Sequence, residues 1–331
     1  MAVTLKDIAK KAGVSVMTVS RALNNKSDIS KETKDYILKI AHELGYTTNS
    51  LAKSLVTKIT YTIGIIVPDN LDPFYPEIIQ GIADGCRDRG YSIILCHSFG
   101  NADKELDYLR LLRSKRVDGM IIYPVQEDDR YVDELKGSTI PFVFVGRHTD
   151  ALDCDYVMND NVHGAYLAVN HLIQKGHKKI TYICAKPAAS SGKERIAGCK
   201  KAINESGLPS SALNVMTCKP NIESCHQTVK ELIAKNDNST AIFAWDDKLA
   251  IGALRAILEA GLGIPKDIAL VGYNDTEIAR HLFPPLTTIR HASYQIGEIA
   301  AKILLDRLNS EEIVEIKQIV LKPELVVRNT T

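Results

Sequence analysis

The chain has 331 residues, of which 45% are hydrophobic and 24% charged, and its formal net charge is +1. These are ordinary globular values, and they exclude a chain that is disordered over most of its length. Seven cysteines without a C-x-x-C pair fit reduced thiols better than a disulfide framework or a zinc site, and no apolar run approaches the ~20 residues that span a bilayer. We therefore expect a cytoplasmic protein of two domains with room for a small third, without a signal peptide, membrane partner, metal or cofactor.

Positive charge is concentrated at the N-terminus. Residues 1–60 contain ten Lys and Arg against five Asp and Glu, whereas the rest of the chain contains 31 against 35. A short basic segment of this kind suits a nucleic-acid partner, although a solvated surface can have the same composition. The local sequence pattern must distinguish between the two.

Capping residues and apolar periodicity predict three short helices in this basic segment. Thr4, Ser15 and Ser30 are the expected N-cap residues, and Gly13 makes the turn between the first two helices. Two short helices joined by a turn that contains glycine, followed by a third that closes the core, form the helix-turn-helix layout. The second helix of such a unit is the one that reads DNA.

The outward face of this second helix has side chains that suit base recognition. Arg21 can donate two hydrogen bonds to one guanine, and Val16 and Met17 can pack on a thymine methyl group. Ser20 and Asn24 can hydrogen-bond bases or phosphates. We predict double-stranded DNA as a partner, and the alternative is a three-helix cap without a role in DNA binding.

A long motif in this segment resembles a known family. T-L-K-D-I-A-K-K-A-G-V-S-V-M-T-V-S-R-A-L-N at 4–24, E-L-G-Y at 43–46 and S-L-A-K-S-L at 50–55 look like the N-terminus of LacI/GalR bacterial transcription repressors. The resemblance implies that Val16, Met17 and Arg21 contact the bases of a palindromic operator. Our predicted DNA-binding set is Thr4, Ser15, Val16, Met17, Ser20, Arg21, Asn24, Lys53 and Leu55.

Residues 47–60 read as a connection that holds a short helix at about 49–56. A helix of this length is marginal in water, so we expect it to form only with support from outside. The family resemblance implies that Leu55 wedges into the minor groove at the operator centre, a known way of bending DNA. A plain interdomain linker is the alternative reading of this segment.

From residue 61 onward, short apolar runs alternate with helical patterns and predict an α/β core. The runs span 62–67, 92–96, 119–123, 141–145, 180–184, 213–217, 241–245 and 268–272. The rhythm changes at about 146–162, and a final helix at 293–309 precedes strand-like segments at 316–321 and 324–327. This alternation is typical of parallel sheets with helices on both faces, and the two groups of four runs indicate two lobes. We assign about 61–160 and 291–321 to the first lobe and about 161–290 and 322–331 to the second, after a head at 1–46 and a hinge at 47–60.

Candidate ligand-binding residues follow the predicted strands, because ligands bind beyond the carboxyl ends of parallel strands. They are Asp72, Phe74, Tyr75, Arg147, Ser191, Arg195, Asp246 and Asn274. Their carboxylates, guanidinium groups and rings suit a sugar, polyol or purine. Each residue taken singly could equally be a helix cap or a turn residue.

The core also carries motifs that look familial, namely K-R-V-D-G at 115–119, R-I-A-G at 195–198 and V-G-Y-N-D at 271–275. The resemblance implies a two-lobed core like a type I periplasmic binding protein. It further implies a homodimeric repressor that is controlled by a small-molecule effector, a sugar or related metabolite, bound between the lobes. The resemblance adds Trp245 to the predicted ligand-binding residues. The chain departs from the family pattern at Asn274, where many relatives have Asp, and at Asp246, where sugar binders often have Asn.

No enzyme motif accompanies these features. The sequence lacks G-x-G-x-x-G, G-x-x-x-x-G-K-[ST], G-x-S-x-G and H-E-x-x-H. We therefore expect a regulator and no catalytic residues. The alternative is a two-lobed sugar-binding protein or carbohydrate-acting enzyme with an accessory N-terminal domain.

Overall fold

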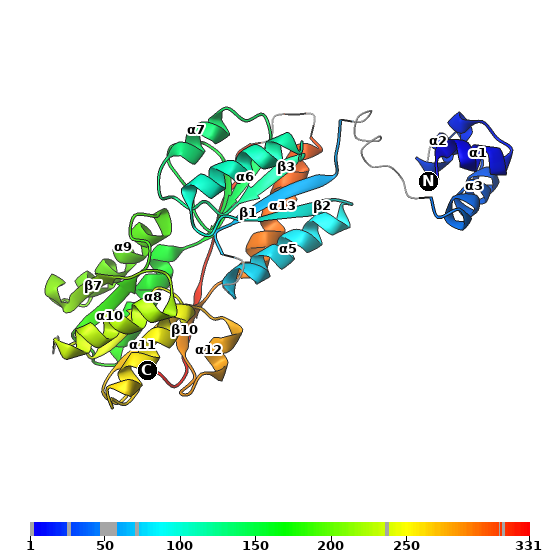
Figure 1. The fold of residues 1–331 in the computed structure, drawn as a ribbon. Helices are drawn as coiled ribbons and strands as arrows, with labels where there is room; N and C mark the ends of the chain where they lie inside the picture. Colours follow the sequence, from blue (N-terminus) through cyan, green and yellow to red (C-terminus); the bar gives the residue numbers. More distant parts are fainter. Residues whose placement is uncertain are drawn as a thin grey trace. The chain divides into compact units, whose positions relative to one another are not determined.

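The computed structural model describes residues 3–24, 28–46, 58–69, 73–235, 238–310, 312 and 315–331. The chain divides into two compact units, residues 1–60 and 61–331 (Figure 1). The predicted hinge helix with Lys53 and Leu55, and the candidate Asp72, lie outside the described residues. In the part that is described, no helix combines the length and the apolar character needed to cross a membrane.

The first unit contains the three predicted helices. They are α1 (Leu5–Ala12), α2 (Val16–Leu23) and α3 (Lys31–Glu43). Ile8, Val19 and Ile37, one from each helix, are fully buried and meet in one small core. The apolar stripe of each helix therefore faces the other two, as the periodicity predicted.

The predicted N-caps are confirmed. Thr4 donates through its backbone N–H and its Oγ1 to Asp7 Oδ2, at 2.8 and 2.7 Å. Ser15 Oγ accepts from the N–H of the residue three positions on at 3.1 Å, and Ser30 does the same at 3.2 Å. Gly13, at φ 66°, ends α1 in the left-handed conformation that glycine adopts without strain. The turn between α1 and α2 is thus set by local sequence.

The second unit contains two sheets of six strands each. Lobe 1 has β1 (Thr62–Val67), β2 (Ser92–His97), β3 (Gly119–Ile122), β4 (Phe142–Val145), β5 (Asp155–Asn159) and β11 (Gln318–Leu321), in the order β11-β5-β4-β3-β1-β2. Lobe 2 has β6 (Ile180–Cys184), β7 (Leu213–Thr217), β8 (Ala241–Ala244), β9 (Ala269–Asn274), β10 (Thr287–Arg290) and β12 (Glu324–Val326), in the order β12-β10-β9-β8-β6-β7. All neighbouring strands run parallel except the pair β10 and β12.

Helices cover both faces of each sheet (Figure 1). In lobe 1, α5 (Phe74–Asp88) and α13 (Ser293–Leu308) pack on one face, and α6 (Ala102–Ser114) and α7 (Arg130–Lys136) on the other. In lobe 2, α8 (Asn161–Gln174) and α9 (Ser190–Glu205) lie opposite α10 (Ile222–Ala234) and α11 (Asp247–Glu259), and α12 (Glu277–His281) precedes β10. This layered arrangement is the predicted α/β architecture.

Two glycines let α5 and α13 approach closely. A Cβ at Gly81 would lie 2.1 Å from the carbonyl oxygen of Tyr294, and one at Gly297 would lie 2.1 Å from that of Ile78. Neither distance is compatible with a side chain, so both positions require glycine. This contact fastens a helix from near the C-terminus to the first lobe.

The sequence analysis missed two strands, β5 and β10. Residues 146–162 were interpreted only as a change of rhythm, and 287–290 were not assigned to a strand. Both strands carry polar side chains that tertiary partners satisfy. Arg307 donates to both carboxylate oxygens of Asp155 on β5, at 2.8 and 3.0 Å, and Thr288 on β10 donates to Asp247 Oδ1 at 2.6 Å.

The chain passes between the lobes three times, after β5, after β10 and after β11. Residues near these crossovers therefore sit close to both sheets. His291 follows β10, and it is fully enclosed between the lobes by Asn159 at the end of β5 and Asn274 at the end of β9.

Candidate functional site

The outward face of α2 exposes two large apolar side chains. Met17 is 64% exposed and Val16 is 42% exposed, while Val19 and Ala22 on the opposite face are buried. Arg21 and Asn24 are exposed beside them, and Ser20 is half-buried. Exposing large apolar side chains to water is unfavourable, so this face is suited to contact with another surface.

Several of the predicted DNA-binding side chains already have local partners. Arg21 forms an ion pair with Asp28 at 3.3 Å, and both side chains are about half exposed. Asn24 donates from Nδ2 to the backbone carbonyl of Ser20 at 2.8 Å. Exposed ion pairs contribute little free energy, so Arg21 can exchange Asp28 for another acceptor at small cost.

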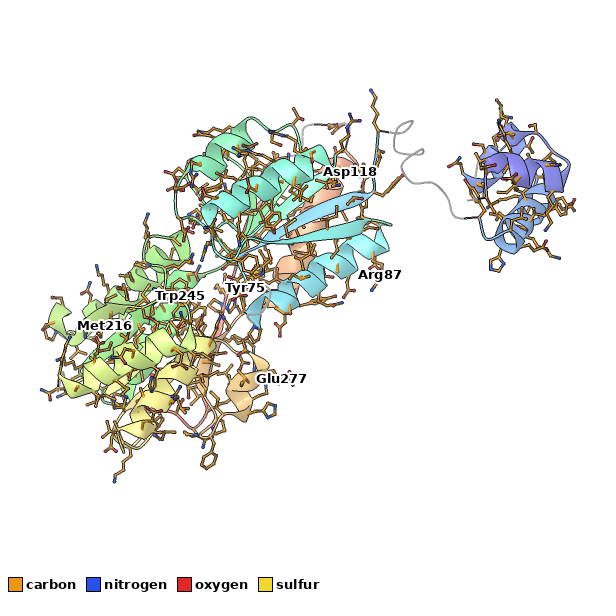
Figure 2. All side chains as sticks on the ribbon, viewed as in Figure 1. Tyr75, Arg87, Asp118, Met216, Trp245 and Glu277 are labelled. Atoms are coloured by element: carbon orange, nitrogen blue, oxygen red, sulfur yellow. The ribbon has the colours of Figure 1, made fainter. Side chains whose placement is uncertain are left out.

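A cavity of about 480 Å³ opens between the two lobes of the core. Its lining residues are Pro68, Asp69, Tyr75, His97, Phe99, Gly100, Glu127, Arg147, Lys186, Pro220, Trp245, Asp246 and Lys248. Tyr75 comes from lobe 1 and Trp245 from lobe 2, and the two lie on facing parts of the lobes (Figure 2). Its size is that of a small-molecule site, and it lies beyond the carboxyl ends of the strands.

The predicted ligand-binding residues divide into two groups. Tyr75, Arg147, Trp245 and Asp246 line the cavity. The other described candidates do not line it. They are Phe74, Ser191, Arg195 and Asn274, and contacts connect three of them to it: Phe74 packs on Tyr75 with ring centres 5.1 Å apart, Arg195 lies over Trp245, and Asn274 bonds His291, which packs on Phe74.

Arg147 presents a buried cation to the cavity. Its NH1 donates to the carbonyl oxygens of Pro124 and Val125 at 2.6 and 2.8 Å, and its guanidinium carbon lies 5.0 Å from the ring centre of Tyr123. Its Nε is buried and has no hydrogen-bond partner among the described residues. A buried donor of this kind is costly unless an acceptor reaches it, so Arg147 is suited to hold a polar ligand.

Arg195 is held rigidly at the start of α9. Its Nε donates to Asn161 Oδ1 at 3.1 Å and its NH1 to the carbonyl oxygen of Trp245 at 2.6 Å. The guanidinium lies 4.5 Å from the ring centre of Trp245 and 3.6 Å from that of Tyr273. Arg195 therefore sets the position of Trp245, which lines the cavity.

His291 connects the lobes through two amides. Its Nε2 donates to Asn274 Oδ1 at 2.8 Å, and its Nδ1 accepts from Asn159 Nδ2. Burial, together with the charge of Arg195, lowers the pKa of His291 to about 3, so the ring is neutral. Because the Asn274 oxygen is engaged by His291, the amide nitrogen is the group that Asn274 can offer to a ligand.

The buried histidine predicts an acid-sensitive fold. The unfolded chain takes up a proton on His291 below about pH 6.5, whereas the folded chain does not until about pH 3, so stability is full above pH 6.5 and falls as the pH drops. This linkage amounts to about 1–2 kcal/mol between pH 6.5 and 5. Denaturant unfolding of wild type and His291→Asn at about pH 7.5 and pH 5 measures it. We expect a larger loss in wild type, and an equal loss in both would contradict the assignment.

Polar residues outside the predicted ligand-binding set also line the cavity. Lys248 from lobe 2 bonds Asp69 from lobe 1 at 3.2 Å, and Lys186 lies 3.7 Å from Glu127. His97 stacks on Phe99 with ring centres 3.8 Å apart. His97 is the last residue of β2, and Lys186 comes two residues after the end of β6. The rule that ligands bind beyond strand ends could therefore have identified both residues. The pairing across the lobes has no signal in the sequence.

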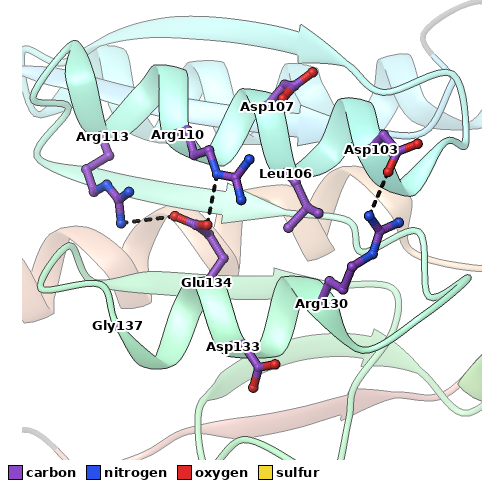
Figure 3. Close-up of a pocket in the computed structure, with 9 residues that line it drawn as sticks. All are labelled: Asp103, Leu106, Asp107, Arg110, Arg113, Arg130, Asp133, Glu134 and Gly137. Carbon is purple, nitrogen blue, oxygen red and sulfur yellow. Dashed lines mark hydrogen bonds and ion pairs between the residues drawn. The ribbon is translucent and has the colours of Figure 1, made fainter.

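A second cavity, of about 570 Å³, lies between α6 and α7 (Figure 3). Arg110 and Arg113 each lie 3.0 Å from a carboxylate oxygen of Glu134, and Arg130 lies 2.7 Å from Asp103. These charges neutralise one another across the two helices. The groove is thus a salt-bridge network that joins α6 to α7, and it has the chemistry of a helix contact more than that of a ligand site.

Comparisons with known proteins agree with this arrangement. Residues 4–49 match the family described as bacterial regulatory proteins, lacI family, and residues 60–321 match periplasmic binding proteins and the sugar binding domain of the LacI family. The chain is 35% identical over 328 residues to the HTH-type transcriptional repressor PurR of Pasteurella multocida, covering 99% of this chain and 98% of that one.

Solved structures are similar over the whole chain. The lac repressor dimer bound to operator and the anti-inducer ONPF is 27% identical, with a TM-score of 0.90, and the match covers 100% of this chain and 99% of that one. The transcriptional regulator CelR in complex with cellobiose is 28% identical, with a TM-score of 0.77, covering 99% of this chain and 100% of that one.

A helix-turn-helix unit joined to a two-lobed binding core defines a DNA-binding transcriptional regulator with an effector domain. The chain belongs to the LacI family of bacterial regulatory proteins.

Proposed function

We propose that this chain is a cytoplasmic, homodimeric repressor that binds a palindromic operator and is controlled by a sugar or related metabolite. The effector would occupy the cavity between the lobes, and lobe closure would alter the spacing of two DNA-reading heads. Two heads are needed because one small helix-turn-helix unit buries too little DNA surface for high specificity.

The exposed face of α2 is the observation that carries this proposal. Val16 and Met17 stand out from the first turn of a helix whose other face is fully packed, and Arg21 lies one turn further along. Apolar contacts to thymine methyl groups and a bidentate arginine are the main tools of major-groove reading. Thr4 and Ser15, which cap α1 and α2, are assigned to phosphate contacts at these helix starts.

The dimer is supported by apolar side chains on the surface of the core. Leu95 on edge strand β2 is 41% exposed, Ile278 on α12 is 44% exposed and Phe283 is 91% exposed. Large exposed apolar groups on both lobes favour an interface that uses both. We assign residues 1–46 to the head, 47–60 to the hinge and 61–331 to the core.

The cavity supports a small polar effector. Arg147, Asp69 and Asp246 offer donors and acceptors, while Tyr75 and Trp245 offer rings on opposite sides. Rings and bidentate polar groups are the usual means of holding a sugar. We assign binding without turnover to this site, and the regulators named above support a regulatory role over a carbohydrate-acting enzyme.

Selection of DNA from a random pool with the full chain tests the proposal. We expect a palindromic sequence to be enriched, and fluorescence anisotropy to show tight, salt-dependent binding with two chains per duplex. A panel of sugars and related metabolites is then added, first in a thermal-shift screen. At least one should stabilise the core and change operator affinity in either direction. Failure to enrich any sequence would contradict the proposed function.

Leu55→Ala distinguishes a DNA wedge from a plain linker. If Leu55 inserts between base pairs, its loss should weaken operator binding on the order of tenfold to a hundredfold and reduce DNA bending. Non-specific binding, which depends on Lys and Arg, should change little. Anisotropy and gel-based bending assays measure both effects. Unchanged operator affinity and bending would instead support the interpretation of residues 47–60 as a plain interdomain linker.

A further inference from the structure

Cys218 differs from the other cysteines of the chain. All seven are described as free thiols, and Cys218 is the one that is not buried. Burial raises the pKa of Cys86 and Cys96 to about 11 and that of Cys154 to about 12, which keeps these thiols protonated and inert. At Cys218 a hydrogen bond donated by the Cys225 thiol lowers the pKa. The lowered pKa increases the share of the thiolate, the reactive form, at this position.

The loop between β7 and α10 brings Cys218 and Cys225 together. The N–H of Cys218 donates to the carbonyl oxygen of Cys184 at 3.2 Å, which fixes it beside the end of β6. Cys225 lies in the first turn of α10, and its N–H donates to Asn221 at 3.2 Å. The N–H of Lys219 donates to Ser224 Oγ at 3.0 Å and closes the loop between the two cysteines. Both sulfurs belong to the same packed cluster of lobe 2.

Small molecules can reach one sulfur and not the other. Cys218 lines a cavity of about 630 Å³, together with Lys186, Lys219, Pro220 and Ser224. Cys225 is fully buried behind it, and hydrogen bonding to Cys218 together with burial raises its pKa. A half-buried cysteine with a lowered pKa beside a buried thiol is the arrangement of an attacking cysteine and a resolving cysteine.

We propose that Cys218 and Cys225 form an oxidation site that converts to an intramolecular disulfide when the chain meets a peroxide. Neither cysteine belongs to the proposed DNA-binding or effector-binding residues, so the site goes beyond the proposed function. It adds a modification chemistry to a chain whose other five cysteines are buried.

The reaction balances with hydrogen peroxide as the oxidant. The Cys218 thiolate attacks one peroxide oxygen, the O–O bond breaks, and the departing hydroxide takes up the proton that the thiol released, giving water and a sulfenic acid. The Cys225 sulfur then attacks the Cys218 sulfur and the S–O bond breaks. The Cys225 proton leaves with the oxygen as a second water. Two thiols are oxidised and one peroxide is reduced.

The site borders the cleft between the lobes. Pro220 lies in the loop that the disulfide would close, and it lines both this cavity and the inter-lobe cavity. Lys186, which bonds Glu127 across the lobes, also lines both. Oxidation would therefore constrain a loop on the wall of the cleft.

Peptide mapping of the full chain after treatment with hydrogen peroxide tests the proposal. Free thiols are alkylated under non-reducing conditions, and the protein is digested and analysed by mass spectrometry. We expect one cross-linked peptide, joining Cys218 to Cys225, that disappears after treatment with dithiothreitol. We also expect Cys218 to react at least about tenfold faster than the five other cysteines, which serve as internal controls.

Two variants separate the roles of the sulfurs. Cys218→Ser should prevent cross-linking and leave Cys225 reduced. Cys225→Ala should leave Cys218 as a sulfenic acid that dimedone traps, and circular dichroism checks that both variants are folded. The proposal is overturned if Cys218 reacts no faster than Cys86 or Cys154, or if Cys218 pairs with a cysteine other than Cys225.

Discussion

Arg21→Ala is expected to remove the discrimination between operator and non-operator DNA while weak, salt-sensitive binding remains. Arg21 is half exposed on α2, and its partner Asp28 is also exposed, so the substitution leaves no buried group unsatisfied. An arginine that pairs with guanine contributes about 1–3 kcal/mol of discrimination, and a palindrome contains two such contacts. Contacts to phosphates do not depend on sequence and should persist.

Anisotropy titrations with the selected operator and a scrambled duplex measure the effect of Arg21→Ala. The matched control is Lys39→Ala, which removes one positive charge from the exposed surface of α3 in the same head. Lys39→Ala should change both affinities slightly and to the same degree. If Arg21→Ala also weakens the two duplexes equally, then Arg21 acts only as a general positive charge.

Arg195→Ala is expected to weaken effector binding on the order of a hundredfold without weakening DNA binding in the absence of effector. The side chain joins Asn161 to the carbonyl of Trp245 and supports the Trp245 ring, which lines the cleft. Hydrogen bonds to charged groups contribute about 1.5–3 kcal/mol each, and the substitution removes two of them with a cation–π contact.

Calorimetry with a ligand found in the thermal-shift screen measures this loss. Arg255→Ala is the control, because Arg255 lies on the surface of α11 and pairs with Glu259 and Glu223, at 2.8 and 3.0 Å. This substitution removes an arginine from the same lobe without changing the cleft. The Arg255→Ala variant should therefore bind the ligand with the affinity of the wild type. Denaturant unfolding of both variants separates lost binding from lost stability. Ligand affinity equal to wild type in Arg195→Ala would remove this residue from the site.

Local sequence signals were sufficient for the small head. Thr4, Ser15 and Ser30 cap helices through hydrogen bonds to residues three positions on, and Gly13 makes a turn that needs a left-handed conformation. These interactions act within a few residues of chain, so the sequence predicts them directly. In the core, most strands were predicted because each is a continuous apolar run that is visible in the local sequence.

Elements and residues that depend on distant partners were not predicted. β5 and β10 were not predicted as strands, because the partners of Asp155 and Thr288 lie far away in the chain, on α13 and α11. Lys248 and Asp69 are separated by 179 positions and meet only because the lobes face each other. Asn274 was selected as a ligand contact, whereas its bond to His291 and its φ of 109° follow from the crossover between lobes.

The three crossings between the lobes also affect how the chain can fold while it is being synthesised. The sheet of lobe 1 lacks β11, and the sheet of lobe 2 lacks β12, until residues 318–326 have left the ribosome. Thr330 then completes lobe 2, because its Oγ1 accepts from Thr287 N–H at 2.8 Å and donates to the Leu270 carbonyl at 2.6 Å. Domains generally fold as units during synthesis. Here the sheet of neither lobe can be completed before β11 and β12 have emerged. A truncation before residue 318 would thus leave both sheets without a strand, whereas a truncation between β11 and β12 would leave only the sheet of lobe 2 incomplete.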